Sequence, residues 1–295
     1  MRPLRSERLA RVISVGRNAA WIAFEDETAV RLASFRKTIA RETVAPGDLV
    51  ETTPLDDERV VIDARLPRTF ALQRTTGSGR VTTMAANVDG LAIVVAFARP
   101  PPHPAMIDEL TAFAEIHGLR PRLIFTKPDL ADPAERERLP RLYAGLGYAA
   151  LVVNPKTGAG IDAMEAEFAD AHTLLIGQSG VGKSSLFRAL GGGGAVGDVS
   201  RAGRGRQTTT AGRLHRTAHG FLIDSPGVGD FALAQTSPAE LSGAFVDFVP
   251  FLGQCRFADC RHLDEPACAI TRAVGDERIA RSRYESYRTI LQRPR

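Results

Sequence analysis

The chain lacks any long hydrophobic segment. Its longest wholly apolar run, residues 91–98, is far shorter than the roughly 20 residues that a membrane-spanning helix needs. Three arginines near the start (Arg2, Arg5 and Arg8) are followed by no apolar stretch of the kind found in secretion signals. We therefore expect a cytoplasmic protein with no membrane partner.

Lysine, cysteine and tryptophan are also scarce. Among 38 basic residues only four are lysines, three residues are cysteines, and Trp21 is the single tryptophan. An odd number of cysteines without a secretion signal argues against a disulfide framework. With 295 residues, of which 44% are hydrophobic and 24% charged, the chain is long enough for two or three globular domains.

A glycine-rich loop at residues 177–184 carries the best specified chemistry. Its sequence, Gly-Gln-Ser-Gly-Val-Gly-Lys-Ser, lies between an apolar run at 172–176 that predicts a buried strand and a segment at 183–190 that predicts a helix. In such loops backbone N–H groups surround phosphate oxygens at the positive end of the helix. We expect Lys183 to reach the β- and γ-phosphates and the Ser184 hydroxyl to bind Mg²⁺.

A second motif, Asp-Ser-Pro-Gly at 224–227, follows another apolar run at 220–223. Asp224 therefore stands at the carboxyl end of a predicted strand, where open α/β sheets bind ligands. There its carboxylate can hold Mg²⁺ through water, and the Gly227 N–H can contact the γ-phosphate. Asp-x-x-Gly alone is a common turn, but its place shortly after a phosphate loop indicates a nucleotide switch.

A third motif, Thr-Lys-Pro-Asp at 126–129, ends a strand predicted at 122–125. The Asp129 carboxylate can accept hydrogen bonds from guanine N1–H and N2–H₂, which adenine cannot offer, so GTP is favoured over ATP. Thr126 stands where asparagine is commoner, so a hydroxyl must substitute for an amide donor.

Three of the four lysines lie in the loops expected to bind the nucleotide. The phosphate loop has Lys183, the base motif has Lys127, and a loop after the predicted strand at 149–153 has Lys156 close to Asn154. A slim ammonium fits where the planar guanidinium fork does not. We expect the loop at 154–156 to brace the base from its other side.

The order of the motifs differs from that of most GTPases, because the base motif precedes the phosphate loop. The doubly wound nucleotide domain is thus circularly permuted. Since the chain ends of such a domain lie close together, a permutation keeps the sheet and relocates the ends. The switch motif at 224–227 then leads almost directly into the C-terminal part of the chain.

All three cysteines and one of the six histidines fall within fourteen residues, as Cys255, Cys260, His262 and Cys268. Thiolates and an imidazole in tetrahedral array suit Zn²⁺, and four protein ligands make a closed, structural site. The alternative is a disulfide or free buried thiols, against which the odd cysteine count argues. We predict one structural zinc ion per chain.

Together these motifs resemble the small ribosomal subunit biogenesis GTPase family (RsgA), the circularly permuted GTPases of bacteria. The resemblance rests on the three nucleotide motifs, the cysteine cluster and the segment Gly-Arg-Gln-Thr-Thr-Thr at 205–210, and it spans nearly the whole chain. It implies a multidomain α/β protein with an N-terminal OB-type β-barrel (1–66), a central circularly permuted P-loop GTPase domain with a doubly wound sheet (67–232) and a C-terminal zinc-bound helical domain (233–295). It also implies GTP hydrolysis stimulated by the 30S subunit late in its maturation, with contacts to 16S ribosomal RNA, and we expect a monomer.

The motifs and the resemblance define the expected site residues. Lys183 and Gln207 take the catalytic positions, although family members usually have histidine in place of Gln207, and an amide can orient water but cannot take a proton at neutral pH. Mg²⁺ is expected on Ser184, Asp224 and Thr209, the middle of three neighbouring threonines. The expected GTP-binding residues are Thr126, Lys127, Pro128, Asp129, Asn154, Lys156, Gly177, Gln178, Ser179, Gly180, Val181, Gly182, Lys183, Ser184, Ser185 and Gly227.

Short alternating runs before residue 67 predict a small barrel of about five strands. They lie at 11–15, 20–24, 29–32, 49–53 and 59–62, with polar turns between them. An SH3-like barrel would look the same, so the OB assignment depends on the resemblance. OB barrels bind nucleic acid on one face, but a docking module without RNA contact would also fit, and Trp21 suits a core position as well as a base-stacking one.

Basic charge gathers in two other segments. Residues 200–216 carry five arginines and no acid, and residues 270–295 carry seven arginines against three acids. Such clusters fit the phosphate backbone of RNA, although the nucleotide's own phosphates explain the first equally well, and a solvated helix face explains the second. In the tail we expect a helix over 276–291 with Ile279, Tyr287 and Ile290 on one side.

Three functions are compatible with these motifs. The first is a ribosome-assembly GTPase. The second is an RNA-binding module with negligible turnover, which Gln207 and Val228 favour, because many GTPases place a water-orienting glutamine at the latter position. The third is a metabolic P-loop enzyme that uses ATP.

Overall fold

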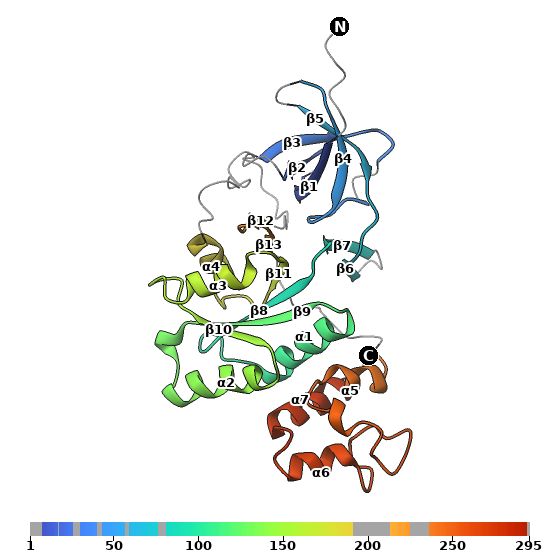
Figure 1. The fold of residues 1–295 in the computed structure, drawn as a ribbon, viewed down its shortest axis with the longest axis vertical. Coiled ribbons are helices and arrows are strands. Elements are labelled where there is room, and N and C mark those ends of the chain that lie inside the picture. Colours follow the sequence, from blue (N-terminus) through green and yellow to red (C-terminus); the bar gives the residue numbers. More distant parts are fainter. Residues whose placement is uncertain are drawn as a thin grey trace.

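The structure, a computed structural model, has three parts in a row: a β-barrel, a sheet flanked by helices, and a group of short helices near the C-terminus (Figure 1). It describes residues 8–16, 18–25, 30–39, 43–56, 59–75, 81–190, 213–224 and 236–293. None of the helices in these ranges is long and apolar enough to cross a membrane.

The N-terminal barrel is built from five strands: β1 (Arg8–Val15), β2 (Ala19–Ala23), β3 (Val30–Phe35), β4 (Leu49–Pro54) and β5 (Val60–Arg65). It closes in the order β1-β2-β3-β5-β4, with every neighbouring pair antiparallel except β3 and β5. Side chains alternate between inside and outside, and Val12, Ile22, Val50 and Ile62 are fully buried in the barrel core. The closed order, with β5 between β3 and β4, confirms the OB-type barrel.

A two-stranded hairpin, β6 (Ala71–Thr75) and β7 (Val81–Ala86), follows the barrel and was not predicted from the sequence. Its sequence signal is weak but present, because Gly77 and Gly79 separate two short runs that are moderately rich in threonine and apolar residues. The hairpin lies between the barrel and the main sheet in Figure 1.

The central sheet has six strands in the order β10-β9-β8-β11-β13-β12. Neighbours are parallel except the edge strand β12, which runs antiparallel to β13. The strands are β8 (Gly90–Ala96), β9 (Arg120–Thr126), β10 (Ala149–Val153), β11 (His172–Ile176), β12 (Arg213–Arg216) and β13 (Phe221–Asp224). Permutation has therefore preserved a mostly parallel sheet.

Both faces of the sheet are covered. Every residue of β8 is buried, which agrees with the wholly apolar sequence of that strand. Ile93 and Val95 share a core with the helices α1 and α2, whereas Ala92 and Val94 share another with α3 and α4. The bounds of these helices are α1 (Pro104–Ile116), α2 (Pro133–Gly145), α3 (Ile161–Phe168) and α4 (Lys183–Ala189). The doubly wound architecture is thereby confirmed.

The barrel and the sheet share one hydrophobic cluster, which includes Ile13 and Ala23 of the barrel and Phe221 of β13. The guanidinium of Arg11 lies 4.8 Å from the centre of the Phe221 ring, so the barrel meets the sheet at this point. Trp21 is half-buried and packs against the same cluster. Packing between parts of the chain therefore accounts for this tryptophan.

The C-terminal part packs three helices, α5 (Pro238–Ala244), α6 (Ala269–Gly275) and α7 (Arg281–Leu291), around Phe245, Phe248 and Tyr287. The expected single helix over 276–291 is wrong in its start, because α6 ends at Gly275 and α7 begins only at Arg281. Between them Glu277 has a φ of +58°, a left-handed conformation that no α-helix can continue. Ile279, Tyr287 and Ile290 are nevertheless all buried in the same core.

A buried ion cluster ties this part to the central domain. The Arg283 guanidinium donates to Asp108 of α1 at 2.6 Å and to Asp247 at 2.9 Å, and the Tyr143 hydroxyl of α2 also donates to Asp108 at 2.8 Å. Burial alone would lower the pKa of Arg283, but the two carboxylates raise it, so the group stays charged. Arg283, counted above among the basic residues of the tail, is therefore not available to RNA.

Replacing Arg283 by methionine is expected to lower the free energy of unfolding by about 3 kcal/mol, because the Asp108 and Asp247 carboxylates would remain buried without their cation. Urea titration followed by circular dichroism measures the change. Arg288→Met is the matched control, since Arg288 lies on the same helix and is 39% exposed. Equal unfolding midpoints for the two variants would contradict the assigned role.

Candidate nucleotide-binding and metal sites

The phosphate loop links β11 to α4 and adopts a path that requires glycine. A Cβ on Gly177 would lie 2.4 Å from the Val94 carbonyl oxygen, and Gly180 and Gly182 have φ angles of +81° and +106°. The Lys183 ammonium donates to the carbonyls of Gly177 at 2.5 Å and Gln178 at 2.9 Å. The loop thus folds around its own lysine.

The remaining loop residues differ in exposure. Val181 is buried against the sheet, whereas Ser179 and Gly180 are exposed. Ser184 is exposed on the first turn of α4, and Ser185 beside it is half-buried. An exposed hydroxyl at the start of the helix is available to a Mg²⁺ ion that accompanies the phosphates.

The base motif contacts the phosphate loop directly, because β9 and β11 both flank β8 and end at the same edge of the sheet. The Thr126 hydroxyl, fully buried, donates to the Val181 carbonyl at 2.5 Å. The Lys127 ammonium donates to the Gly180 carbonyl at 2.7 Å and also to the carbonyl of Arg99. The hydroxyl of Thr126 therefore does supply a donor where an amide is commoner, and the Arg99 carbonyl is a contact that no sequence signal indicated.

The loop at 154–156, expected to brace the base, lies beside the base motif. Pro128 and Asp129 form a short 3₁₀ turn after Lys127, and the Asn154 amide approaches the Asp129 carboxylate at 3.4 Å. The Asn154 side-chain oxygen in turn accepts from the Lys156 N–H at 3.0 Å. The two loops expected on opposite sides of the base are thus neighbours.

The predicted switch residues lie largely outside the described part of the chain. Asp224 ends β13, paired with Leu175 of β11, so its backbone stands beside the strand that enters the phosphate loop. Nothing is described of its side chain, and Gln207, Thr209 and Gly227 lie outside the described residues. Of the predicted magnesium ligands, only the Ser184 side chain is described.

The four predicted zinc ligands come together at the start of α6. Their ligand atoms all lie within 4.8 Å of one another, with Cys255 Sγ and Cys268 Sγ each 3.5 Å from His262 Nδ1 and 3.9 Å from each other. Tetrahedral zinc would hold sulfurs about 3.8 Å apart and sulfur and nitrogen about 3.6 Å apart. Three of the four donors therefore already have the spacing of a tetrahedral zinc site, and the fourth, Cys260, lies within 4.8 Å of them.

Electrostatics at this cluster also fit a metal. Burial lowers the pKa of His262, which keeps its imidazole neutral, as a ligand must be. Burial, helped by the neighbouring thiols, raises the pKa of Cys260 to about 12, so without a cation this thiol stays protonated. Zinc binding would have to release that proton.

Contacts around the cluster hold its loop in shape. The Glu265 carboxylate accepts from the N–H groups of Arg261 at 2.9 Å and Leu263 at 2.8 Å. The carbonyls of the same two residues accept from the hydroxyls of Tyr287 and Tyr284 on α7, both at 2.8 Å. These tyrosines bind the metal loop to the helical core, a role that the sequence did not reveal.

An OB-type barrel, a P-loop sheet whose base motif precedes its phosphate loop, and a Cys₃His cluster define a circularly permuted GTPase. Comparison with known proteins agrees. A family model described as RsgA GTPase matches residues 65–234. The small ribosomal subunit biogenesis GTPase RsgA of Ectopseudomonas mendocina (strain ymp) is 41% identical over 252 residues, which cover 83% of this chain and 73% of that protein. The protein of the same name from Azotobacter vinelandii is 42% identical over 238 residues, 78% of this chain and 69% of the relative.

Two solved structures share the fold of this chain. YjeQ from Thermotoga maritima superposes with a TM-score of 0.76 at 29% identity, over 98% of this chain and all of the other. YloQ, described as a circularly permuted GTPase, superposes with a TM-score of 0.74 at 24% identity, over 100% of this chain and 99% of the other, and supports the fold. The chain belongs to the RsgA GTPase family, and it is a GTP hydrolase of a family that uses Mg²⁺.

Proposed function

We propose that this protein hydrolyses GTP during late maturation of the small ribosomal subunit, with the 30S subunit and its 16S RNA as partners. The relatives of about 40% identity are named for small-subunit biogenesis, and they match most of this chain. The observation that carries the proposal is the direct contact of the base motif with the phosphate loop through Thr126 and Lys127. Lys127 and Gly180 are 53 positions apart in the sequence, and Thr126 and Val181 are 55 positions apart. Their contacts support a single site formed by the two motifs.

In this proposal a single GTP spans the carboxyl edge of the sheet. Asp129 accepts from the guanine base, with Lys127 on one side of the ring and the loop of Asn154 and Lys156 on the other. The Lys183 ammonium exchanges its two carbonyl partners for the β- and γ-phosphates. Backbone N–H groups at 177–185 donate to the same phosphates. The buried contacts of Thr126 fix the distance between the two ends of the nucleotide.

The reaction is phosphoryl transfer to water, which depends on positioning and charge neutralisation. Ser184 would hold Mg²⁺ together with Asp224 and Thr209. The metal, when bound, neutralises charge that develops on the β- and γ-phosphates. Gln207 is proposed to orient the attacking water, with the ribosome supplying the remaining help.

The three parts of the chain are proposed as domains at 1–66, 67–232 and 233–295, in a monomeric, cytoplasmic protein. RNA contact is proposed for the tail, where Arg272, Arg278 and Arg281 are exposed around α6 and α7. Because Arg283 is buried in the ion cluster, fewer arginines of the tail can contact RNA than its sequence contains.

Purified 30S subunits are expected to raise the rate of GTP hydrolysis at least about tenfold, as activating partners do when they complete a GTPase site. Phosphate release with and without 30S particles measures this, and ATP in place of GTP is expected to give no stimulated release. Unchanged turnover with 30S particles would remove the assembly role. Binding without turnover would favour the RNA-binding module, and equal use of ATP would favour a metabolic enzyme.

A further inference from the structure

A cavity lies at the opposite edge of the sheet from the phosphate loop. It has a volume of about 420 Å³, within the range of roughly 300–1,000 Å³ typical of small-ligand sites. The amino ends of β9 and β10, the carboxyl ends of α1 and α2, and Val246 after α5 surround it. It is therefore separate from the GTP site and borders the C-terminal helices.

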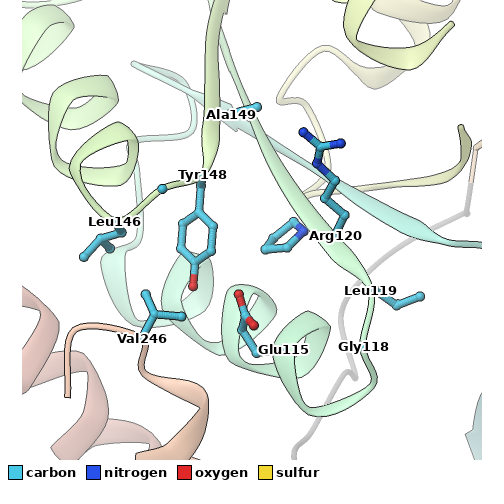
Figure 2. Close-up of a pocket in the computed structure, with 10 residues that line it drawn as sticks. Glu115, Gly118, Leu119, Arg120, Leu146, Tyr148, Ala149 and Val246 are labelled. Carbon is cyan, nitrogen blue, oxygen red and sulfur yellow. The ribbon is translucent and has the colours of Figure 1, made fainter. Parts of the chain in front are cut away.

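A buried tyrosine hydroxyl and a carboxylate line this cavity. Tyr148 is 7% exposed, and its hydroxyl makes no hydrogen bond of standard geometry among the described residues, with the Glu115 carboxylate as its nearest acceptor in electrostatic effect. Figure 2 shows that hydroxyl and the half-buried Glu115 carboxylate of α1 pointing toward each other. Burial raises the pKa of Tyr148, and the nearby Glu115 charge raises it further although the Arg283 charge lowers it, so the phenol stays neutral beside a carboxylate.

The electrostatic field in the cavity favours a cation. Helices α1 and α2 both end at its wall, and neither has a basic residue in its last turn to offset the negative charge of a helix carboxyl end. Arg120, the one basic residue that lines the cavity, is 70% exposed and lies 3.7 Å from Glu167 outside it. Figure 2 shows its guanidinium directed away from Glu115.

We propose that this cavity binds a guanidinium group, carried either by an arginine side chain of a protein partner or by a small guanidine. A planar guanidinium can donate two parallel hydrogen bonds to the Glu115 carboxylate. Its remaining N–H groups can reach the Tyr148 oxygen, and its face can stack on the phenol ring. A compact ammonium lacks the planar fork that donates two parallel hydrogen bonds to one carboxylate.

Nuclear magnetic resonance titration of the full, GDP-bound protein tests this. The probes are Nα-acetyl-arginine methylamide, its neutral analogue with citrulline, and ethylguanidinium. Gly118 and Gly147 line the cavity, and their amide signals report occupancy. We expect the arginine probe to shift both signals saturably and the citrulline probe to leave them unchanged.

Glu115→Gln is expected to weaken arginine binding at least about tenfold, since a charge-assisted bidentate contact is lost, and Tyr148→Phe about threefold. Glu137→Gln, at an exposed carboxylate of α2, is the matched control and should bind normally. GTP turnover should not change in any of the three variants. A failure of the guanidinium proposal would therefore not affect the proposed GTPase function.

Several results would overturn the proposal. They are the absence of saturation, equal shifts with citrulline, and undiminished binding by Glu115→Gln in a variant that keeps the wild-type spectrum elsewhere. Saturation by ethylguanidinium but not by the arginine probe would replace the protein source with a small molecule. Binding of the arginine probe at least as tight as that of ethylguanidinium supports the protein source.

Discussion

Replacing Lys183 by alanine is expected to lower 30S-stimulated GTP turnover by about 10³-fold or more, a loss typical of removing a cation or donor from a phosphoryl-transfer site. The Lys183 side chain already lies within the phosphate loop, bonded to the carbonyls of Gly177 and Gln178. Its charge therefore lies inside the loop that would surround the phosphates. Single-turnover release of labelled phosphate measures the loss.

Two further variants separate charge from shape. Lys183→Arg keeps the charge but adds a planar fork, and it is expected to lose nearly as much activity, because the space inside the loop fits only a narrow group. Lys37→Ala removes an exposed lysine of the barrel segment and should behave as wild type. Turnover by Lys183→Ala within tenfold of wild type would contradict the assignment of this loop.

The sequence predicted the parts of the fold that local chemistry specifies. The phosphate loop is predictable because a Cβ atom would block its backbone path, as at Gly177. Glycine is therefore required at these positions, and the resulting motif can be recognised in the sequence. The cysteine cluster was found because its ligands are close in the chain. The barrel strands were predicted from their alternating pattern, but the OB strand order depended on the resemblance, since pairing of β3 with β5 joins residues far apart.

Contacts between distant residues left no such signal. Arg283 belongs to an arginine-rich tail, and only its position opposite Asp108, 175 residues earlier, makes it a buried structural group. The Arg99 carbonyl that accepts from Lys127 is a backbone atom, which any residue type provides. Glu115 and Tyr148 likewise meet only because α1 ends and β10 begins at the same edge of the sheet. Charge and periodicity describe one segment at a time and cannot find these pairs.

Removal of zinc is expected to unfold the C-terminal helices while the barrel and the sheet stay folded. Cys268 is buried in the helical core as well as in the metal cluster, and Tyr284 and Tyr287 connect that core to the metal loop. Structural zinc in small domains supplies on the order of 10 kcal/mol of folding free energy, more than this small core can replace. We expect one zinc per chain by elemental analysis and, after chelation, fast amide exchange in α6 and α7 but not in β8 or β11.

His262→Gln should reproduce the effect of the chelator, because three thiolates without the imidazole leave the tetrahedron incomplete. His219→Gln is the matched control, since His219 is exposed and far from the cluster in sequence. Loosened helices would also release Arg283 from Asp108, so the variant should show a lower unfolding midpoint for the central domain as well. Unchanged exchange in α6 and α7 after complete zinc removal would mean that the hydrophobic core alone holds this part together.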